Sequence, residues 1–304
     1  MNYVIKHFID IDNFSKREFD SILSTAGKIK KNSKPYQKIF KNKSLGLLFQ
    51  KESTRTRLSF SIGIQKLGGT VIELNSKQIG FGTRESEEDI LRTLSQYIDC
   101  LMIRNNNHTK IKHYASLNIL PIINGLSNYS HPCQILSDIF TLQNEIGALN
   151  NKTICWVGDY NNVLSSLIHI QKIYLFQLNI VIPKIIYNKN KKYIKNIKNS
   201  KLHITHDIKQ GVLNSHCVMT DVWLSMGEKN IKKKNFFRNY QVNNNIMKLA
   251  KKNSIFMHCL PAHRGEEVSN EVIDGPNSLV WMQAQNRIYV QQAILNYIIN
   301  NKIK

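Results

Sequence analysis

Hydroxyl and guanidinium side chains alternate in one short stretch of the chain. Ser53-Thr54-Arg55-Thr56-Arg57 directly follows an apolar, strand-like run at 44–49. A helix that starts here would aim free backbone N–H groups, hydroxyls and a guanidinium at one point, which suits an oxyanion such as phosphate. The alternative is an ordinary helix N-cap followed by arginines that face solvent. Arg55 and Arg57 stand two residues apart, which argues against both binding the same ligand.

Three more polar side chains stand where strands are expected to end. Arg104 closes the apolar run 100–104, and His131 opens a helix after the run 119–124. Gln134 lies one helical turn after His131, so both face the same side. Because the carboxyl ends of parallel strands share one edge of a sheet, we expect these residues near the 53–57 stretch. A single histidine is more often structural than catalytic, and His131 taken alone leaves that alternative open.

The second half of the chain carries a further set of candidate residues after its own strand-like runs. Each has an ordinary alternative, such as capping a helix, ending a strand in a turn or packing in the core. Their joint occurrence favours a second binding region. The residues are Asn162, Asp221, Ser225, Met226 and Cys259.

The elements that must position these residues alternate along the chain. Helical patterns, the first opened by the capping box Ser15 to Glu18, separate the strand-like runs. Such alternation predicts an α/β fold with two domains, each a parallel β-sheet flanked by helices, joined by interdomain helices. We expect the domains at 1–149 and 150–287, with a last helix, 288–304, packing back on the first. The strand-like runs are 44–49, 70–74, 100–104, 119–124, 153–157, 179–186, 216–223 and 254–260.

Composition limits the classes of protein that the chain can belong to. Its 304 residues suit two domains, and 42 basic against 21 acidic residues give a net charge of +21. That charge raises nucleic acid as a partner, but the lysines lie in Lys/Asn-rich tracts such as 188–201, without interleaved glycine or aromatic residues. We therefore expect no nucleic-acid partner. The excess charge would still attract small anions.

The cysteines and the apolar runs indicate a cytoplasmic protein. Five cysteines include no C-x-x-C pair, which argues against a disulfide framework or a zinc site, and we expect them to be buried thiols. No apolar run reaches the length of about 20 residues that spans a bilayer. The N-terminus lacks a basic-then-apolar leader pattern, so we expect no membrane partner.

Taken together, the motifs resemble the aspartate/ornithine carbamoyltransferase family. The 53–57 stretch, Arg104 and the His-Pro-x-Gln helix start at 131–134 are similar to the carbamoyl phosphate half of that family. The motifs DVWLSMGE (221–228), HCLPA (258–262) and HRGEEVSNEVIDGP (263–276) resemble its ornithine branch. The resemblance runs from KHFIDIDNFS (6–15) to the last helix.

The resemblance implies two sets of ligand residues and no metal or other cofactor. Gln78 would act in a neighbouring subunit's site, because the family forms trimers, so we expect a homotrimer or a multiple of trimers. Arg57 would brace its loop from outside the site. Ornithine would be bound by Asn162, Asp221, Ser225 and Met226. Carbamoyl phosphate would be bound by Ser53, Thr54, Arg55, Thr56, Gln78, Arg104, His131, Pro132, Cys133, Gln134, Cys259, Leu260 and Arg287.

The implied reaction transfers the carbamoyl group of carbamoyl phosphate to the δ-amine of L-ornithine, giving L-citrulline and phosphate. Arg104, Thr56 and His131 would stabilise the tetrahedral oxyanion, and Arg55 the leaving phosphate. The amine must be neutral to attack, and a desolvated, cation-rich site would lower its pKa from about 10.4. Asp221 would hold the α-amino group. Cys259 would help the amine proton leave, unless it is only a buried thiol with a backbone contact.

Some positions depart from the family pattern, and some alternatives stay open. Gln50 stands where the family often has Glu, and the run 282–287 lacks the acidic residues commonly found there but keeps Arg287. These departures bear on turnover rate and stability more than on the reaction. Aspartate, putrescine or an acylated ornithine could replace ornithine, although the Ser-Met-Gly loop and the cysteine of HCLP argue against aspartate. A non-catalytic basic scaffold is the alternative outside enzymes. We expect arginine biosynthesis over arginine breakdown.

Overall fold

The chain divides into two compact units, each built on its own parallel sheet. The computed structural model describes residues 5–195, 200–225, 228 and 231–300. Unit 1 takes in residues up to Phe140 and from Asn286 onward, and unit 2 is Thr141–Gln285. Helices α5 (Pro132–Ile146) and α11 (Val280–Asn300) each run across this division. The predicted fold class is confirmed.

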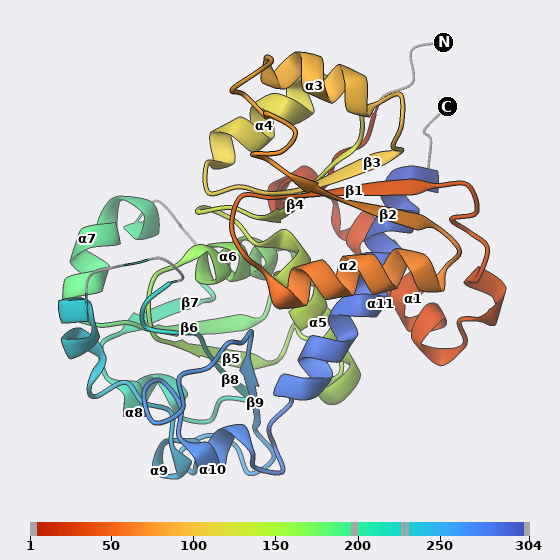
Figure 1. Ribbon diagram of the computed structural model, residues 1–304. Helices are drawn as coiled ribbons and strands as arrows, with labels where there is room; N and C mark the ends of the chain where they lie inside the picture. The colour runs from red at the N-terminus through yellow and green to blue at the C-terminus, as the bar shows by residue number, and fades with distance from the viewer. Residues whose placement is uncertain (1–4, 196–199, 226–227, 229–230, 301–304) are drawn as a thin grey trace. The chain divides into compact units, whose positions relative to one another are not determined.

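Unit 1 is a four-stranded parallel sheet with the order β2-β1-β3-β4. Helices α3 and α4 lie on one face, and α1, α2 and most of α11 lie on the other (Figure 1). The N-terminal segment runs beside β4, where Phe8 exchanges backbone hydrogen bonds with Ile122 and Asn124 at 2.8 Å. The elements are β1 (Ser44–Phe49), β2 (Thr70–Asn75), β3 (Cys100–Arg104), β4 (Ile122–Leu126), α1 (Lys16–Lys31), α2 (Thr54–Lys66), α3 (Glu87–Leu94) and α4 (His108–Ser116).

Unit 2 is a five-stranded parallel sheet with the order β7-β6-β5-β8-β9. Helices α8, α9 and α10 cover one face and α6 the other (Figure 1). Strands β5, β8 and β9 are therefore neighbours, and their carboxyl ends share one edge. The elements are β5 (Thr153–Val157), β6 (Gln177–Val181), β7 (Leu202–Thr205), β8 (Cys217–Thr220), β9 (Ile255–His258), α6 (Asn162–Tyr174), α7 (Lys184–Lys195), α8 (Ile208–Val212), α9 (Asn244–Met247), α10 (Asn270–Ile273) and the 3-10 turn η3 (Ile231–Phe237).

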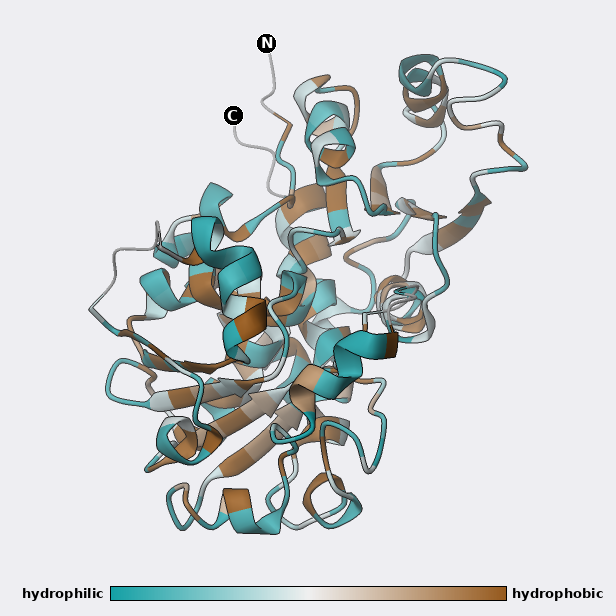
Figure 2. Cartoon of the chain, turned by 90° about the vertical axis from the view of Figure 1, so that its left-hand side faces the viewer, coloured by the Kyte–Doolittle hydropathy of each residue, from teal (hydrophilic) through white to brown (hydrophobic). Residues whose placement is uncertain are grey.

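The inner strands are mostly apolar because helices cover both of their faces. All residues of β3, β8 and β9 and the last four of β5 are buried. In Figure 2 much of the interior is brown, while many helices have teal outer faces. Strand β2, at the edge of its sheet, is mostly exposed. Burial on both faces thus accounts for the apolar runs that predicted the strands.

Three predicted strand limits are wrong, and proline explains two of them. The run 216–223 is a strand only over Cys217–Thr220. The run 179–186 is not one strand: β6 ends at Val181 and α7 starts at Lys184, because Pro183 has no N–H for the sheet and suits a helix start. The run 119–124 likewise becomes a strand only from Ile122, just after Pro121. The capping box at Ser15 and Glu18 is confirmed, with both reciprocal hydrogen bonds formed.

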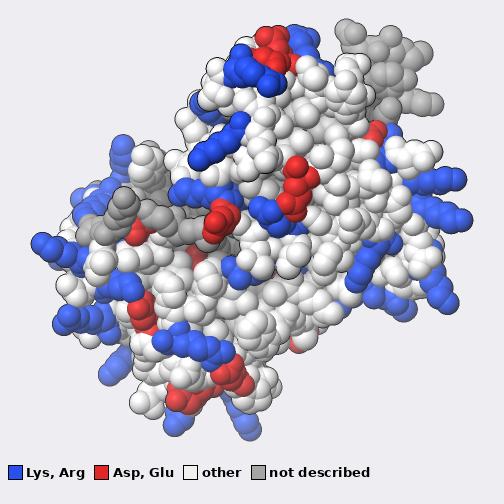
Figure 3. Space-filling view, in the orientation of Figure 1, with Lys and Arg blue, Asp and Glu red and all other residues white. Residues whose placement is uncertain are grey.

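Charged side chains of both signs are scattered over the face drawn in Figure 3. In Figure 3 the lysines and arginines are spread over the visible face with aspartates and glutamates among them, rather than gathered in one band. Of the five cysteines, four are buried and Cys259 is partly exposed, and all five are thiols. None of the helices among the described residues is long and apolar enough to cross a membrane.

Candidate active site, built in two halves

The start of α2 lacks a side-chain cap, which leaves its backbone N–H groups directed outward. Ser53 is the N-cap residue, yet its hydroxyl makes no capping hydrogen bond. Its Oγ instead accepts a hydrogen bond of 2.9 Å from Nη1 of Arg104, at the end of the adjacent strand β3. A 13-residue helix whose N-cap side chain leaves the first N–H groups uncapped is a ready anion site, through both its dipole and its donors.

Thr56 is held in the same way by a second arginine. It is buried, and its Oγ1 accepts a hydrogen bond of 2.9 Å from Arg287 on α11, 231 residues further along the chain. A hydroxyl that accepts from an arginine keeps its own hydrogen for another acceptor. Ser53 and Thr56 can therefore both donate to an oxyanion while an arginine supports each of them.

His131 lies buried among three guanidinium groups. Burial, followed by the positive charges of Arg287, Arg104 and Arg55, holds the pKa of His131 well below its usual value. Burial and Arg55 likewise lower the pKa of Arg104. His131 is thus a neutral imidazole in a positive environment. An anionic ligand would stabilise a cluster of this kind, and groups with such shifted pKa values are common at functional sites.

Gln134 and Cys133 continue the helix start that His131 opens. Gln134 is buried, and its Nε2 donates a 2.8 Å hydrogen bond to Oδ1 of Asp138 one turn later. The thiol of Cys133 donates to the backbone oxygen of Asn124 at 3.4 Å, and burial raises its pKa to about 12. Cys133 therefore uses its side chain inside the fold, so a contact with a ligand would come from its backbone.

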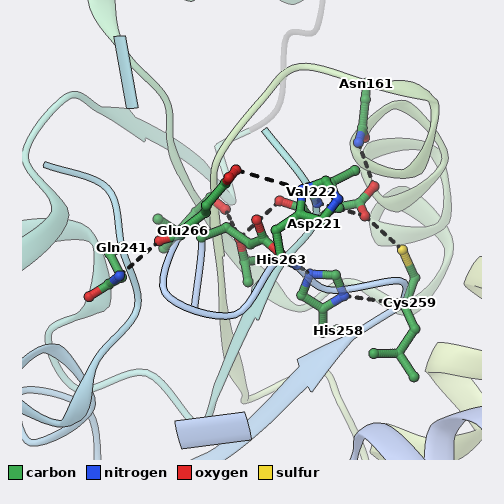
Figure 4. A network of polar contacts seen from close by, with 12 residues as sticks. Asn161, Asp221, Val222, Gln241, His258, Cys259, His263 and Glu266 are labelled. Carbon is green, nitrogen blue, oxygen red and sulfur yellow. Dashed lines mark hydrogen bonds and ion pairs between the residues drawn. The ribbon is translucent and has the colours of Figure 1, made fainter. Parts of the chain in front are cut away.

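In unit 2, Asp221 is the centre of a polar network at the shared edge of β5, β8 and β9 (Figure 4). Its Oδ1 accepts hydrogen bonds from the backbone N–H of Val222 at 2.9 Å and from the Cys259 thiol at 3.0 Å. Its Oδ2 accepts a 2.7 Å hydrogen bond from Asn161. Three donors thus converge on one buried carboxylate and hold its direction. The network presents oriented carboxylate oxygens, which suit an ammonium group.

The turn between β5 and α6 supports this network. Gly158 has φ +140°, a conformation that side chains oppose, and Asn161 then caps α6 through its Oδ1 while its Nδ2 reaches Asp221. Burial raises the pKa of Asp159 to about 6, against the opposing pull of Lys233, whose ammonium lies 2.5 Å from the Asp159 carboxylate and 3.0 Å from Glu228. The Lys233 contact links the turn to the segment that follows the Asp221 loop.

Comparisons with known proteins decide the family. Residues 6–144 match the model of the aspartate/ornithine carbamoyltransferase carbamoyl-P binding domain, and residues 150–298 match that of the Asp/Orn binding domain of the same family. The chain belongs to the aspartate/ornithine carbamoyltransferase family. The resemblance predicted from the motifs is confirmed.

Similar members of the family cover nearly the whole chain. An ornithine carbamoyltransferase of Ruthia magnifica is 42% identical over 98% of this chain and 100% of its own length. The ornithine carbamoyltransferase structure from Pyrococcus furiosus superposes with a TM-score of 0.91 and 35% identity, covering 100% of both chains. The anabolic ornithine carbamoyltransferase structure from Campylobacter jejuni has a TM-score of 0.86 and 32% identity, covering 97% of this chain and 99% of its own.

Arg57 lies outside the anion site of this family member. Its guanidinium pairs with Glu73 on the edge strand β2 and lies 4.9 Å from the ring centroid of Phe49. Position 50, just after β1, is a glutamine, and the carboxylate that pairs with Arg57 comes from Glu73 on β2. The Arg57 side chain thus ties the first turn of α2 to strand β2. Arg55, two residues earlier, faces the opposite side of the helix.

Other predicted ligand residues are placed as follows. Gln78 is exposed in the turn that follows β2, Ser225 is exposed, and Pro132 opens α5. Asn162 is the first residue of α6, whereas its neighbour Asn161 is the one that reaches Asp221. Leu260, with φ 57°, donates its backbone N–H to His258 at 2.9 Å. Met226 lies outside the described residues.

A buried histidine–glutamate pair beside Cys259 was not predicted from the sequence. His258 has one ring nitrogen engaged by the N–H of Leu260, so its Nε2 carries the proton and faces Glu267 at 3.3 Å. Both side chains are fully buried. The signal was present in the HRGEEV motif, but only the sheet brings Glu267 to His258. This pair orders the loop that carries Cys259 and Leu260.

Two groups of potential metal ligands occur among the described residues, and both belong to hydrogen-bonded networks. The first is Asp221, His258 and Cys259, and the second is His263, Glu266 and Glu267. Both ring nitrogens of His258 are engaged, and Cys259 bonds directly to Asp221. A metal at the first group would have to replace these hydrogen bonds.

Proposed function

We propose that the protein transfers the carbamoyl group of carbamoyl phosphate to the δ-amine of L-ornithine, giving L-citrulline and phosphate. Unit 1 would bind carbamoyl phosphate and unit 2 ornithine, in line with the domain names of the two family models. The observation that carries the proposal is the double support of Ser53 by Arg104 and Thr56 by Arg287. It leaves two hydroxyl hydrogens and a helix start for one anion.

The residues of unit 1 supply what the transition state needs. Attack on the carbamoyl carbon puts negative charge on its oxygen, and Arg104, Thr56 and neutral His131 would donate to it. Arg55 would stabilise the departing phosphate, whose charge grows as its bond to carbon breaks. Because the three arginines and the helix dipole are already in place, little reorganisation accompanies the reaction. Pro132, Cys133 and Leu260 would add backbone contacts.

The Asp221 network would bind the amino-acid end of ornithine. Asp221 keeps lone pairs beyond the three hydrogen bonds that hold it, and these would accept from the α-ammonium group. Asn162, Ser225 and Met226 would complete the contacts. Fixing the α-ammonium leaves the δ-amine as the group that can react. The Cys259 thiol donates to Asp221, so we assign it an orienting role, and the proton of the attacking amine would pass to the phosphate as it leaves.

A homotrimer fits an apolar surface at one edge of unit 1. Leu58 and Ile62, one turn apart on α2, and Ile72 on β2 are large apolar side chains with 50%, 37% and 44% of their surface exposed. Gln78 follows β2 directly and would reach a neighbouring subunit's site. The test mixes an Arg55→Ala subunit with a Gln78→Ala subunit, each inactive alone. Recovery of activity in mixed oligomers supports a shared site, and no recovery contradicts it.

Two further observations support a role in arginine biosynthesis and a location in the cytoplasm. The anabolic name of the Campylobacter jejuni relative favours arginine biosynthesis. Five thiols, four of them buried, favour the reducing cytoplasm. The scattered lysines in Figure 3 give no continuous track for nucleic acid on the face shown, so we assign the net charge no role in this function.

One assay tests the reaction. Carbamoyl phosphate is supplied with ornithine, aspartate or putrescine in parallel, and carbamoylated products are measured. We expect citrulline only. Product from aspartate at an equal rate would overturn the choice of substrate, and no product from any amine would favour a non-catalytic scaffold.

A matched pair of arginine variants tests the anion site. Arg55→Ala should abolish turnover and leave the melting temperature close to that of the wild type. Arg57→Ala removes the same charge two residues later, from an exposed pair worth less than about 1 kcal/mol, and should keep most of the activity. Equal losses in both variants would remove the specific role of Arg55.

A further inference from the structure

Gln134 and Asp138 form a buried pair on one face of α5. They are four residues apart, their side chains are 1% and 0% exposed, and Nε2 of Gln134 lies 2.8 Å from Oδ1 of Asp138. Both belong to unit 1, as do His131 and Arg104. Asp138 begins no strand or turn and lies outside every motif that the sequence analysis singled out.

The hydrogen bond to Asp138 sets the orientation of the Gln134 side-chain amide, that is, which of Nε2 and Oε1 faces Asp138. Oδ1 of Asp138 is the acceptor in this hydrogen bond, so it engages the NH₂ end of the amide and not the carbonyl end. The two ends of a planar amide diverge by about 120°. With Nε2 held by Asp138, Oε1 is turned away from it. Rotating the amide would place two acceptor oxygens against each other in a buried place and break the 2.8 Å hydrogen bond, which is unfavourable.

We propose that Asp138 is a positioning residue that makes Gln134 present an acceptor to the carbamoyl group, so that the site selects acyl phosphates carrying an N–H donor. This inference rests on the proposed function. Carbamoyl phosphate has an NH₂ group on its carbon, and this group can donate to Oε1 of Gln134. Acetyl phosphate has the same phosphate and carbonyl but a methyl group in place of NH₂. Opposite Oε1, the methyl leaves a buried acceptor without a partner, which is the strongest form of discrimination that a polar site offers.

The rival explanation is that the pair only stabilises the helix. Residues four apart on a helix commonly form such hydrogen bonds. A purely structural pair would, when broken, weaken the binding of both acyl phosphates together or lower stability alone. If the pair positions Gln134, breaking it would weaken the binding of carbamoyl phosphate and leave the binding of acetyl phosphate unchanged.

The test is Asp138→Asn, which has nearly the same shape but can face Gln134 with either an acceptor or a donor. The dissociation constants of carbamoyl phosphate and acetyl phosphate are measured by calorimetry, with the melting temperature beside them. We expect carbamoyl phosphate to bind about tenfold more weakly and acetyl phosphate to change by less than about twofold. Ser137→Ala, at the preceding buried position of α5, is the control, and its ratio of the two constants should match that of the wild type.

A reciprocal exchange gives a second, independent readout. In the double variant Gln134→Glu, Asp138→Asn, the amide introduced at position 138 can donate to the carboxylate introduced at position 134. The other oxygen of that carboxylate then accepts from the carbamoyl NH₂. The double variant should recover the preference for carbamoyl phosphate that Asp138→Asn loses, and it can be measured even if the single variant does not fold.

Four results overturn the inference, and they are distinguishable. Parallel weakening of both phosphates in Asp138→Asn assigns the pair to stability. A folded double variant without preference contradicts the orientation of Gln134. A wild-type protein that binds neither phosphate defeats the proposed function itself, whereas normal turnover with an unchanged preference in Asp138→Asn defeats only the role of Asp138.

Discussion

The thiol of Cys259 donates a hydrogen bond to Oδ1 of Asp221 at 3.0 Å, joining the ends of the neighbouring strands β9 and β8. The bond gives Cys259 a defined task, which is to hold the carboxylate that we assign to the ornithine α-ammonium group. A thiol whose proton points at a carboxylate is a donor in this arrangement, not a base.

Cys259→Ala should therefore weaken ornithine binding more than it slows the chemical step. The loss of one hydrogen bond to a charged group is expected to raise the KM for ornithine about tenfold, with the KM for carbamoyl phosphate little changed. Cys259→Ser keeps a donor and should recover most of the affinity. Steady-state kinetics with each substrate varied in turn measure this. A fall in kcat with an unchanged KM for ornithine would restore the role of Cys259 in proton transfer.

We expect Asn161 to be as important for ornithine binding as Asn162, the neighbouring residue that was predicted as a ligand. Asn161→Asp keeps the oxygen that caps α6 but places a second carboxylate 2.7 Å from Asp221. Two buried carboxylates at that distance cannot both stay ionised, so we expect the KM for ornithine to rise by about tenfold or more at neutral pH. Asn161→Ser keeps a cap without the added charge and serves as the control. Similar KM values in the two variants would show that capping alone matters.

His131 should act in its neutral form. Its pKa lies well below the usual value, because of burial first and three arginines second, so it stays unprotonated at neutral pH. The pH profile of kcat should therefore contain no step near the usual histidine pKa of about 6.5 that belongs to His131. Any step found there should persist in His131→Gln. Replacement by Ala should lower kcat by about 10²–10³ as one oxyanion donor is lost. A histidine step that disappears in His131→Gln would contradict the neutral assignment.

Glu18 should make the fold sensitive to acid. Burial opposes its charge, but hydrogen bonds from Lys6, Ser15 and Tyr297 dominate and lower its pKa from 4.5 to about 2. A lowered pKa of an acid stabilises the fold above pH 4.5, and this contribution is lost as the pH falls towards 2. Glu18→Gln should lower the melting temperature at neutral pH, with a difference from the wild type that shrinks below pH 4.5.

The control for this acid effect is Asp20→Asn on the same helix, whose exposed pair with Lys16 contributes little. It should leave the melting curve nearly unchanged at every pH. A constant gap between Glu18→Gln and the wild type from neutral pH down to about 2.5 would be incompatible with the lowered pKa of Glu18.

The sequence by itself determined the local parts of this protein. Strands buried on both faces need continuous apolar runs, and helix starts follow strand ends, so the alternation of elements and the start of α2 within the 53–57 stretch could be predicted. The opposite orientation of Arg55 and Arg57 follows from helix geometry alone. The strand limits near Pro121 and Pro183 were the local errors, since apolar runs conceal where a missing N–H interrupts a sheet.

Only the tertiary structure decided which distant residues support one another. Thr56 meets Arg287 across 231 positions, and Asn161 meets Asp221 across 60. Such pairs depend on the order of strands in each sheet and on where α11 returns, which no spacing along the chain encodes. For the same reason the sequence pattern pointed to Asn162 and not to Asn161. It also did not pair His258 with Glu267 or Gln134 with Asp138, although three of these four residues lie in the motifs that carry the family resemblance.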